Sequence, residues 1–262
     1  EPVTQAVILA AGRGTRLSPI TDETPKALVP FLGRPLIEHA AAHLVSIGMT
    51  RIAVNTHHLG EQVALHVETT LHTRYPNVTW HISAEAELLG TGGALANLSE
   101  WLGMAPFLVV NADAVFDADL AELIAYQART GVDAVWMTTR EPIYAALRVV
   151  TTDDAGNLCG ITSPAEESGS TFCGVHLASR GLLDTLPAHG MSCVVRDGYL
   201  PWLERGARIG TWQTNGFWAD TGTPDRYIDA HRRGLTRVDR WRQLGLLKQA
   251  EPPRECFQPG AG

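Results

Sequence analysis

Residues 6–17, AVILAAGRGTRL, combine a buried strand with a loop that suits a phosphate. The apolar run at the start has the length and branching of a strand inside a sheet. Gly12 and Gly14 follow and let the backbone turn sharply, so that successive N–H groups can point into one concavity. Arg13 and Arg16 add planar donors that match phosphate oxygens. We expect this segment to hold a nucleoside triphosphate.

The glycines alone are a weak signal, because a G-x-G can be an ordinary tight turn. Position 17 is Leu, where a dinucleotide fingerprint needs its third glycine, and no Gly-Lys-Ser/Thr follows, as a P-loop would require. The longer string from Gly12 through Pro19 to Pro25-Lys26 is far more specific. Lysine occurs only at Lys26 and Lys248 in this arginine-rich chain, which suggests that position 26 needs a compact ammonium.

Strand and helix patterns alternate with short loops over the first 140 residues. This alternation predicts an α/β fold with a mostly parallel sheet and helices on both faces. Ligands bind such sheets at the carboxyl ends of strands, where the Gly12 loop, the Gly90 loop and Asp113 all fall. Helices are expected at residues 35–48, 59–72, 91–98 and 118–130, and strands at 51–55, 77–82, 107–110 and 133–137.

From residue 142 the pattern changes to short strand-like runs separated by polar turns. We expect a small antiparallel lobe that covers one side of the site, followed by returning helices and one more strand. The chain is therefore interpreted as one domain, 1–240, with a core at 1–140, a lobe and returning helices at 141–240, and a tail at 241–262. The lobe strands are expected at 147–151, 158–161 and 172–177, the helices at 179–186, 193–206 and 223–232, and the last strand at 208–213.

Composition excludes several classes of protein. The net charge of −7 argues against a nucleic-acid partner. No run approaches the roughly 18 apolar residues of a membrane span, and no secretory leader pattern is seen. The four cysteines form no C-x-x-C pair or zinc spacing, so we expect reduced thiols and a cytoplasmic protein. No coiled coil or appended β-helix forces assembly, which leaves a monomer or a small homo-oligomer.

Further motifs follow the glycine loop in a fixed order: LGTGGA at 89–94, NAD at 111–113, TFCG at 171–174 and WADTGT at 218–223. With the loop and Lys26 they resemble the signature of the sugar-1-phosphate nucleotidyltransferases. The chain looks most like the short, single-domain members, such as N-acetylmuramate-1-phosphate uridylyltransferase and mannose- and heptose-1-phosphate guanylyltransferases. The resemblance implies a Rossmann-like, doubly wound fold with a sugar-binding lobe, and a Mg²⁺-dependent reaction of an NTP with a sugar 1-phosphate that releases pyrophosphate.

The resemblance also implies roles for single residues. Arg16 and Lys26 are predicted to be catalytic, holding the triphosphate and stabilising charge on the leaving pyrophosphate. Asn111 and Gly174 are expected to bind the sugar. The predicted nucleotide-binding residues are Ala10, Ala11, Gly12, Arg13, Gly14, Thr15, Gly90, Thr91, Gly92 and Gly93, with the last two glycines allowing base and ribose to approach the backbone; Glu85 and Glu87 could accept from a base edge.

Two aspartates are the predicted metal ligands. Mg²⁺ prefers one or two carboxylates together with phosphate oxygens and water. Asp113 and Asp220 each directly follow a predicted strand, and the family analogy assigns both to the metal. We assign Asp117, Asp119 and Asp225 instead to helix starts, where a negative charge meets the helix dipole.

Two departures from the family affect the sugar side. Where many relatives have Glu-Lys-Pro, with a lysine that meets the sugar phosphate, this chain has Thr162-Ser163-Pro164. Where many have Tyr-Gly-Val, it has Tyr144-Ala145-Ala146. What replaces the lysine at Ser163 is open, and Arg148 and Arg196 are the predicted substitutes.

Some alternatives remain. The acceptor could be a non-sugar alcohol phosphate such as phosphocholine, with a cytidylyl donor, or the chain could be a catalytically silent nucleotide-sugar-binding subunit. The base is open between UTP and GTP, and the sugar is not determined. His39 and His43 have a spacing that can bind zinc, but they lack the H-E-x-x-H order, so we expect them to be structural.

Overall fold

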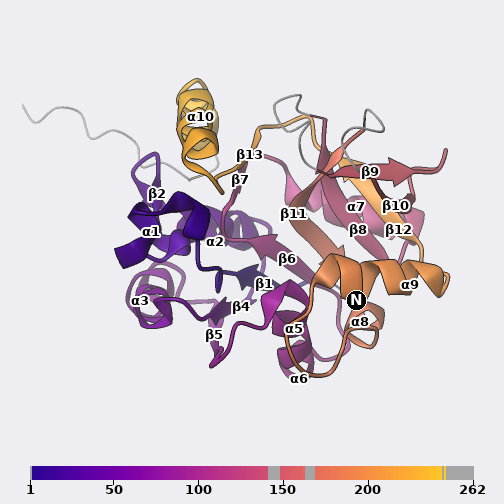
Figure 1. Ribbon diagram of the computed structural model, residues 1–262. Helices are drawn as coiled ribbons and strands as arrows, with labels where there is room; N and C mark the ends of the chain where they lie inside the picture. The colour runs from indigo at the N-terminus through magenta and orange to yellow at the C-terminus, as the bar shows by residue number, and fades with distance from the viewer. Residues whose placement is uncertain (1, 141–147, 163–168, 244, 246–262) are drawn as a thin grey trace, which may run out of the picture.

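The computed structural model describes residues 2–140, 148–162, 169–243 and 245, and its centre is a 7-stranded sheet (Figure 1). Every strand of this sheet except β11 runs in the same direction. This confirms the predicted α/β class with its mostly parallel sheet. In spatial order the strands are β12 (Ile209–Gln213), β8 (Ala134–Thr139), β11 (Thr171–Ala178), β6 (Phe107–Asn111), β1 (Gln5–Leu9), β4 (Arg51–Thr56) and β5 (Thr79–Ala84).

Helices cover both faces of the sheet because its inner strands are apolar on both faces. In β1, Ala6 and Ile8 belong to one core and Val7 belongs to the other. The first core includes residues of α2 (Leu36–Ser46), α3 (Gly60–His66), the π-helix η3 (Val67–Leu71) and α7 (Leu120–Thr130). The second includes residues of α5 (Gly90–Asn97), α6 (Ser99–Leu102), α8 (Arg180–Leu183) and the π-helix η5 (Val194–Tyr199), which continues into α9 (Leu200–Glu204).

A third core lies beside the sheet, where α10 (Pro224–Leu235) and α11 (Val238–Gln243) pack on the short strands β7 (Ala114–Phe116) and β13 (Trp218–Asp220). Trp241 is fully buried there and makes edge contacts with Phe31 and Phe217. The packed structure therefore continues past residue 240, where the tail was expected to begin. Smaller elements nearby are η1 (Thr15–Leu17), α1 (Ile20–Glu23), η2 (Lys26–Leu28), β2 (Pro30–Phe31), β3 (Arg34–Pro35) and α4 (His72–Arg74).

The antiparallel lobe is smaller than expected. It consists of β9 (Val149–Thr152) paired with β10 (Leu158–Thr162). The run at 172–177 was assigned to this lobe, but it lies in β11, between β6 and β8 of the central sheet. The physical reason is burial on both faces, since Val175 and Leu177 enter the first core and Ala178 enters the second.

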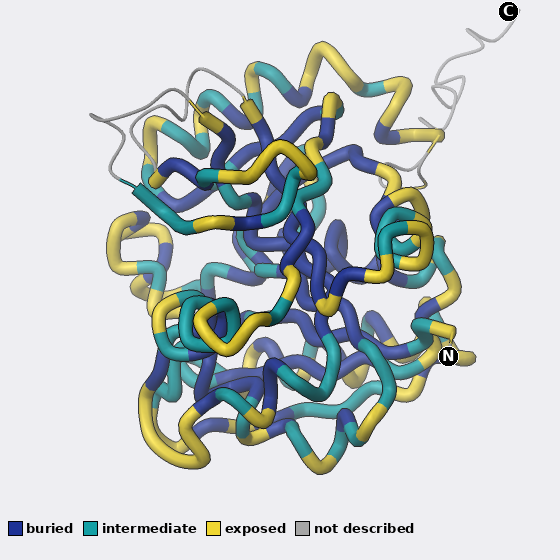
Figure 2. The backbone as a smooth tube through the Cα atoms, turned by 90° about the vertical axis from the view of Figure 1, so that its right-hand side faces the viewer, coloured by how far each residue is buried: buried dark blue, intermediate teal, exposed yellow. Residues whose placement is uncertain are grey.

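Figure 2 shows that the buried backbone is concentrated in the strands at the centre, whereas exposed residues cluster in turns and outer helix surfaces. Among the described residues, no helix is both long enough and apolar enough to cross a bilayer.

Candidate active site

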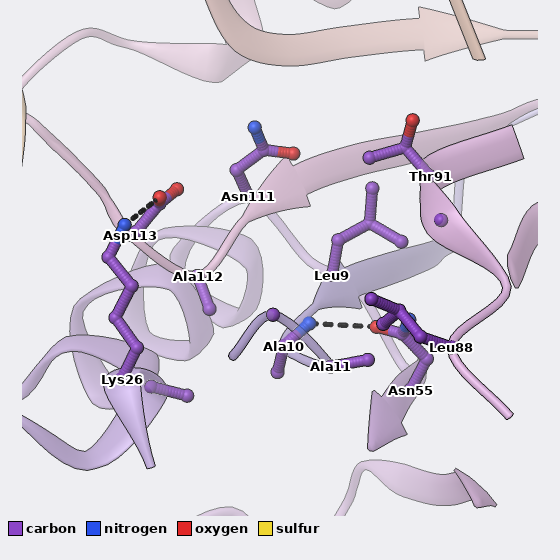
Figure 3. Close-up of a pocket in the computed structure, with 13 residues that line it drawn as sticks. Leu9, Ala10, Ala11, Lys26, Asn55, Leu88, Thr91, Asn111, Ala112 and Asp113 are labelled. Carbon is purple, nitrogen blue, oxygen red and sulfur yellow. Dashed lines mark hydrogen bonds and ion pairs between the residues drawn. The ribbon is translucent and has the colours of Figure 1, made fainter. Parts of the chain in front are cut away.

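A pocket of about 240 Å³ opens at the carboxyl ends of β1, β4 and β6 (Figure 3). The chain goes from β1 to β4 on one side and returns to β6 on the other, so this is the point where strand order reverses and where such sheets bind ligands. Lys26 and Asp113 lie at one end of the pocket, and Leu88 and Thr91 at the other. The lining residues are Leu9, Ala10, Ala11, Gly12, Lys26, Ala27, Asn55, Leu88, Gly90, Thr91, Asn111, Ala112 and Asp113.

A buried side-chain network fixes the floor of this first pocket. Asn55 Oδ1 accepts a 2.7 Å hydrogen bond from Ala10 N, and Asn55 Nδ2 donates to Glu85 Oε1 at 2.8 Å. The other carboxylate oxygen of Glu85 accepts from Leu89 N at 3.0 Å. Glu85 is therefore used inside the protein instead of facing a base, and Glu87 is exposed. Sequence reasoning missed Asn55, whose only signal was its position at the end of a strand.

The glycine loop divides into two parts. Ala10, Ala11 and Gly12 line the pocket, whereas Arg13, Gly14 and Thr15 do not. Gly14 has a φ of +66°, and a Cβ there would lie 2.8 Å from Thr21 Cγ2, so a glycine is required. Thr21 Oγ1 also donates to Gly14 O at 2.8 Å and fixes the turn.

The second glycine segment makes its close contacts with protein. A Cβ at Gly92 would lie 2.6 Å from Ser192 Oγ, and one at Gly93 would lie 2.5 Å from Gly190 O. Gly92 N donates to Ser192 O at 2.9 Å, so the start of α5 is bound to the 190–193 loop. Gly90 and Thr91 line the pocket, whereas Gly92 and Gly93 do not. Contact with the 190–193 loop leaves no room for a side chain at either of these two glycines.

The two predicted metal ligands each form an ion pair with a basic side chain. Lys26 Nζ pairs with Asp113 Oδ2, and the lysine side chain is only 11% exposed. Asp220 pairs with Arg226 on α10, and its Oδ1 accepts from Gly222 N at 2.7 Å. Arg226 was not predicted, because nothing in the sequence distinguishes it from other arginines at a helix start.

The two aspartates belong to the paired ends of β7 and β13, and both line one pocket. Asp220 is in register with Ala114, the neighbour of Asp113 in the chain. Thr221 Oγ1 donates to Asp113 O at 2.9 Å and holds the two strand ends together. Among residues 2–140, 148–162, 169–243 and 245, no group of three or more His, Cys, Asp or Glu could hold a metal ion. Two carboxylates that line the same pocket nevertheless fit Mg²⁺, which takes the rest of its ligands from phosphates and water.

A second, larger pocket of about 540 Å³ shares Asn111 and Asp113 with the first. Gly174 has a φ of +71°, and a Cβ there would lie 2.5 Å from Asn111 Nδ2, so this glycine makes room for the asparagine. We call this the second pocket; its lining residues are Arg16, Asn111, Asp113, Ala114, Arg148, Val150, Ile161, Thr171, Phe172, Cys173, Gly174, Cys193, Val195, Arg196, Leu200, Trp218 and Asp220.

The predicted sugar-phosphate arginines both lie in this second pocket. Arg196 forms hydrogen bonds to Asp197 through Nε at 2.9 Å and Nη2 at 2.8 Å. Asp197 Oδ2 also accepts from Cys193 N at 2.7 Å, which fixes the start of η5. Arg148 is exposed at the start of β9. Ser163 and residues 144–146 lie outside the described residues.

The histidine pair is structural. His39 Nε2 lies 3.0 Å from Phe31 O, and His43 Nε2 lies 2.6 Å from Phe116 O. Burial lowers the pKa of each imidazole to about 4, so both are neutral at pH 7.

Asp119 accepts a 2.9 Å hydrogen bond from Ala121 N and so caps α7, as expected of a residue at a helix start. Asp117 is buried and pairs with Arg237.

Comparison with known proteins identifies the family to which the chain belongs. The family model described as nucleotidyl transferase matches residues 5–237. A mannose-1-phosphate guanylyltransferase catalytic subunit beta of Drosophila melanogaster is 27% identical over 98% of this chain and 67% of its own length. A probable mannose-1-phosphate guanylyltransferase 3 of Oryza sativa is 30% identical over 87% of this chain and 64% of its own length. The chain thus spans about two thirds of these relatives.

Two solved structures share the fold. HddC from Yersinia pseudotuberculosis, complexed with GMP-PN, has a TM-score of 0.73 and 23% identity over 88% of this chain and 100% of its own. A UDP-glucose pyrophosphorylase complexed with UDP-glucose has a TM-score of 0.74 and 16% identity over 90% of this chain and 100% of its own. The match over nearly the whole sheet and both pockets confirms the resemblance seen in the motifs: the chain belongs to the nucleotidyl transferase family.

Proposed function

We propose that the chain transfers a nucleotidyl group from UTP or GTP to a sugar 1-phosphate and releases pyrophosphate. The observation that carries this proposal is that the two pockets meet at Asn111 and Asp113. A nucleotide in the first pocket and an acceptor phosphate in the second would meet at that wall. Catalysis of such a reaction depends mainly on positioning and on neutralising charge.

Each end of the site has a task in this proposal. The base and ribose would lie toward Leu88 and Thr91, and the triphosphate would run toward Gly12 and Lys26. Lys26 would exchange its pairing with Asp113 for the phosphates, and Arg16 would contact them from the acceptor side. Arg148 and Arg196 would hold the phosphate of the acceptor.

Asp113 and Asp220 would together hold Mg²⁺, which when bound supplies positive charge for the phosphate oxygens. This assignment is supported by the position of both aspartates in the lining of one pocket, at the paired ends of β7 and β13. A cytoplasmic location remains a prediction.

A matrix of NTPs against sugar 1-phosphates, read by pyrophosphate release, tests the proposal. The curated relatives are named for mannose 1-phosphate and guanylyl transfer, so GTP with mannose 1-phosphate is the first pair to measure. We expect Asp113→Asn to lower turnover by about 10² or more, the scale for losing an electrostatic stabiliser, and to weaken Mn²⁺ binding measured by electron paramagnetic resonance. Turnover near the wild-type rate in Asp113→Asn would contradict the assignment of Asp113 as a ligand of Mg²⁺.

Other outcomes would favour the alternatives. Turnover with phosphocholine and CTP alone would move the acceptor out of the sugar class. Nucleotide binding without turnover in any pairing would indicate a silent subunit.

A further inference from the structure

Arg226 contacts a predicted metal ligand without lining either pocket. Its Nη1 pairs with Asp220 Oδ2, but Arg226 is not among the residues that line the first or the second pocket. Lys26, which pairs with Asp113, does line the first pocket, where phosphates could take over its charge. The two ion pairs therefore differ, because Lys26 can exchange its partner for a ligand, whereas Arg226 stays with Asp220.

The start of α10 fixes Arg226 in this position. Arg226 N donates to Oγ1 of the N-cap residue Thr223 at 3.4 Å. The hydroxyl of the next residue, Tyr227, donates to Pro30 O. A cation in the first turn of a helix is opposed by the helix dipole, and a partly exposed ion pair adds little to folding. The stability of α10 therefore does not explain an arginine at this position.

Asp220 has a second partner that holds its carboxylate. Gly222 N donates to Asp220 Oδ1 at 2.7 Å, and a Cβ at Gly222 would lie 2.7 Å from the same oxygen. Replacing Arg226 by a neutral residue leaves this hydrogen bond available to orient the carboxylate. We therefore expect Arg226 to act on the site chiefly through its charge.

A fixed positive charge distinguishes between the forms in which a metal ion arrives. A cation paired with a carboxylate lies about 5 Å from a metal ion bound to the same group. At that distance it weakens binding of a bare dication about 10-fold even in water. The complex of a dication with a nucleoside triphosphate is negative overall, so the same charge attracts it. Resting on the metal assignment in the function proposed above, we propose that Arg226 makes Asp220 select the metal–nucleotide complex over the bare metal ion.

Mn²⁺ binding tests this proposal without turnover. Arg226→Gln removes the charge and should bind Mn²⁺ alone about 10-fold more tightly than the wild type, measured by electron paramagnetic resonance. The same variant should bind the Mn²⁺ complex of GTP or UTP, whichever the wild type binds better, about 3-fold or more weakly, measured by calorimetry.

Three further variants serve as controls. Arg226→Lys keeps a positive charge and should restore both affinities toward the wild-type values. Arg226→Ala removes the same charge as Arg226→Gln and provides a second test if the glutamine variant is unstable. Arg232→Gln removes one positive charge at an exposed position later on α10 and should change neither affinity.

The opposite directions of the two effects separate this role from a structural one, since a loosened site would bind both forms more weakly. If Arg226→Gln binds Mn²⁺ no more tightly than the wild type, or binds the complex equally well, the inference is overturned. Pyrophosphate release by the wild type would then still support the proposed function. If the wild type binds no Mn²⁺ with or without nucleotide, the metal assignment fails together with the inference.

Discussion

At the scale of one residue, the surroundings of position 26 explain why it holds a lysine and not an arginine. Its side chain is nearly buried, its Cβ lies close to the Gly14 turn, and its ammonium reaches Asp113. A guanidinium is larger and planar, and it cannot replace a point charge at the same place. The scarcity of lysine in the chain agrees with this packing.

Lys26→Arg should therefore lower kcat/KM for the NTP by about 10-fold or more, and Lys26→Ala by about 10²- to 10³-fold, as expected for an electrostatic stabiliser. Steady-state pyrophosphate release with a parallel melting curve checks this. An arginine variant that is both stable and fully active would contradict a specific need for the ammonium.

Glu38 carries a prediction about pH. Burial of this carboxyl opposes its ionisation, but hydrogen bonds from His66 and Arg74 outweigh burial and lower its pKa to about 2. A depressed pKa stabilises the fold above the ordinary pKa of glutamate, and this stabilisation is lost as pH falls toward 2. A pKa lowered from 4.5 to about 2 corresponds to a contribution of about 3 kcal/mol to the free energy of unfolding at pH 7.

In urea unfolding, the free energy of unfolding of Glu38→Gln should be lower than that of the wild type by about this amount at pH 7. The difference should become smaller as pH falls from about 4.5 to 2. Glu61→Gln, at an exposed position on α3, is the control, and its free energy of unfolding should stay close to that of the wild type at every pH. If the difference in free energy of unfolding between Glu38→Gln and the wild type does not change with pH, the destabilisation comes from packing and not from the charge of Glu38.

At the scale of the element, α5 is bound to the loop before η5. Besides the close approach of Gly92 to Ser192, Val194 N donates to Thr91 Oγ1 at 3.0 Å. Thr91 lines the first pocket, and Val195 lines the second. The glycines of α5 therefore position a segment of the second pocket.

Gly92→Ala should cost about 1–3 kcal/mol of stability, because the added methyl meets Ser192 at 2.6 Å. We also expect KM for the acceptor to rise more than KM for the NTP, since the loop that must move leads into η5. Gly160→Ala is the control, because its Cβ would make an ordinary 3.5 Å contact with Thr151 Oγ1. Unchanged melting and unchanged KM values in Gly92→Ala would contradict this coupling.

The sequence predicted most elements of the sheet and its helices, since their periodicity is local. It misplaced β11, because nothing local to residues 172–177 states which strands they pair with. It could not distinguish the π-helical turns of η3 and η5 from α-helix, since both have similar side-chain periodicity over one turn. Asn55 and Arg226 were missed because their partners, Ala10 and Asp220, are identified only by the fold.

At the scale of the whole molecule, α10 and α11 anchor the strands β7 and β13, which lie next to Asp113 and carry Asp220. Trp241 fills the third core, and Arg237 reaches Asp117, whose Oδ1 accepts from Phe217 N beside β13. The motifs predicted part of the lining of the first pocket, residues 10–12, 26 and 90–91, but not Asn55 or Leu88. The second pocket draws on β6, the β9–β10 hairpin, β11, η5 and β13; Asn111, Gly174, Arg148 and Arg196 were predicted to lie together there, whereas its apolar lining was not predicted.

Trp241→Ala should cost about 3–5 kcal/mol, the range for removing a large buried aromatic side chain. Denaturant unfolding checks this, with Arg242→Ala as the control, because its pairing with Asp239 is exposed and worth at most about 1 kcal/mol. A tryptophan variant as stable as the control would show that α11 contributes little to the fold.

The wall shared by the two pockets, Asn111 with Asp113, has a thermodynamic consequence. Under the proposed function, the nucleotide and the acceptor would touch the same two side chains, so binding of one can change the affinity for the other by a coupling free energy. Reciprocity requires that the acceptor would then change the affinity for the nucleotide by the same factor by which the nucleotide changes the affinity for the acceptor. An affinity measured for one substrate alone would therefore not describe its binding in the presence of the other.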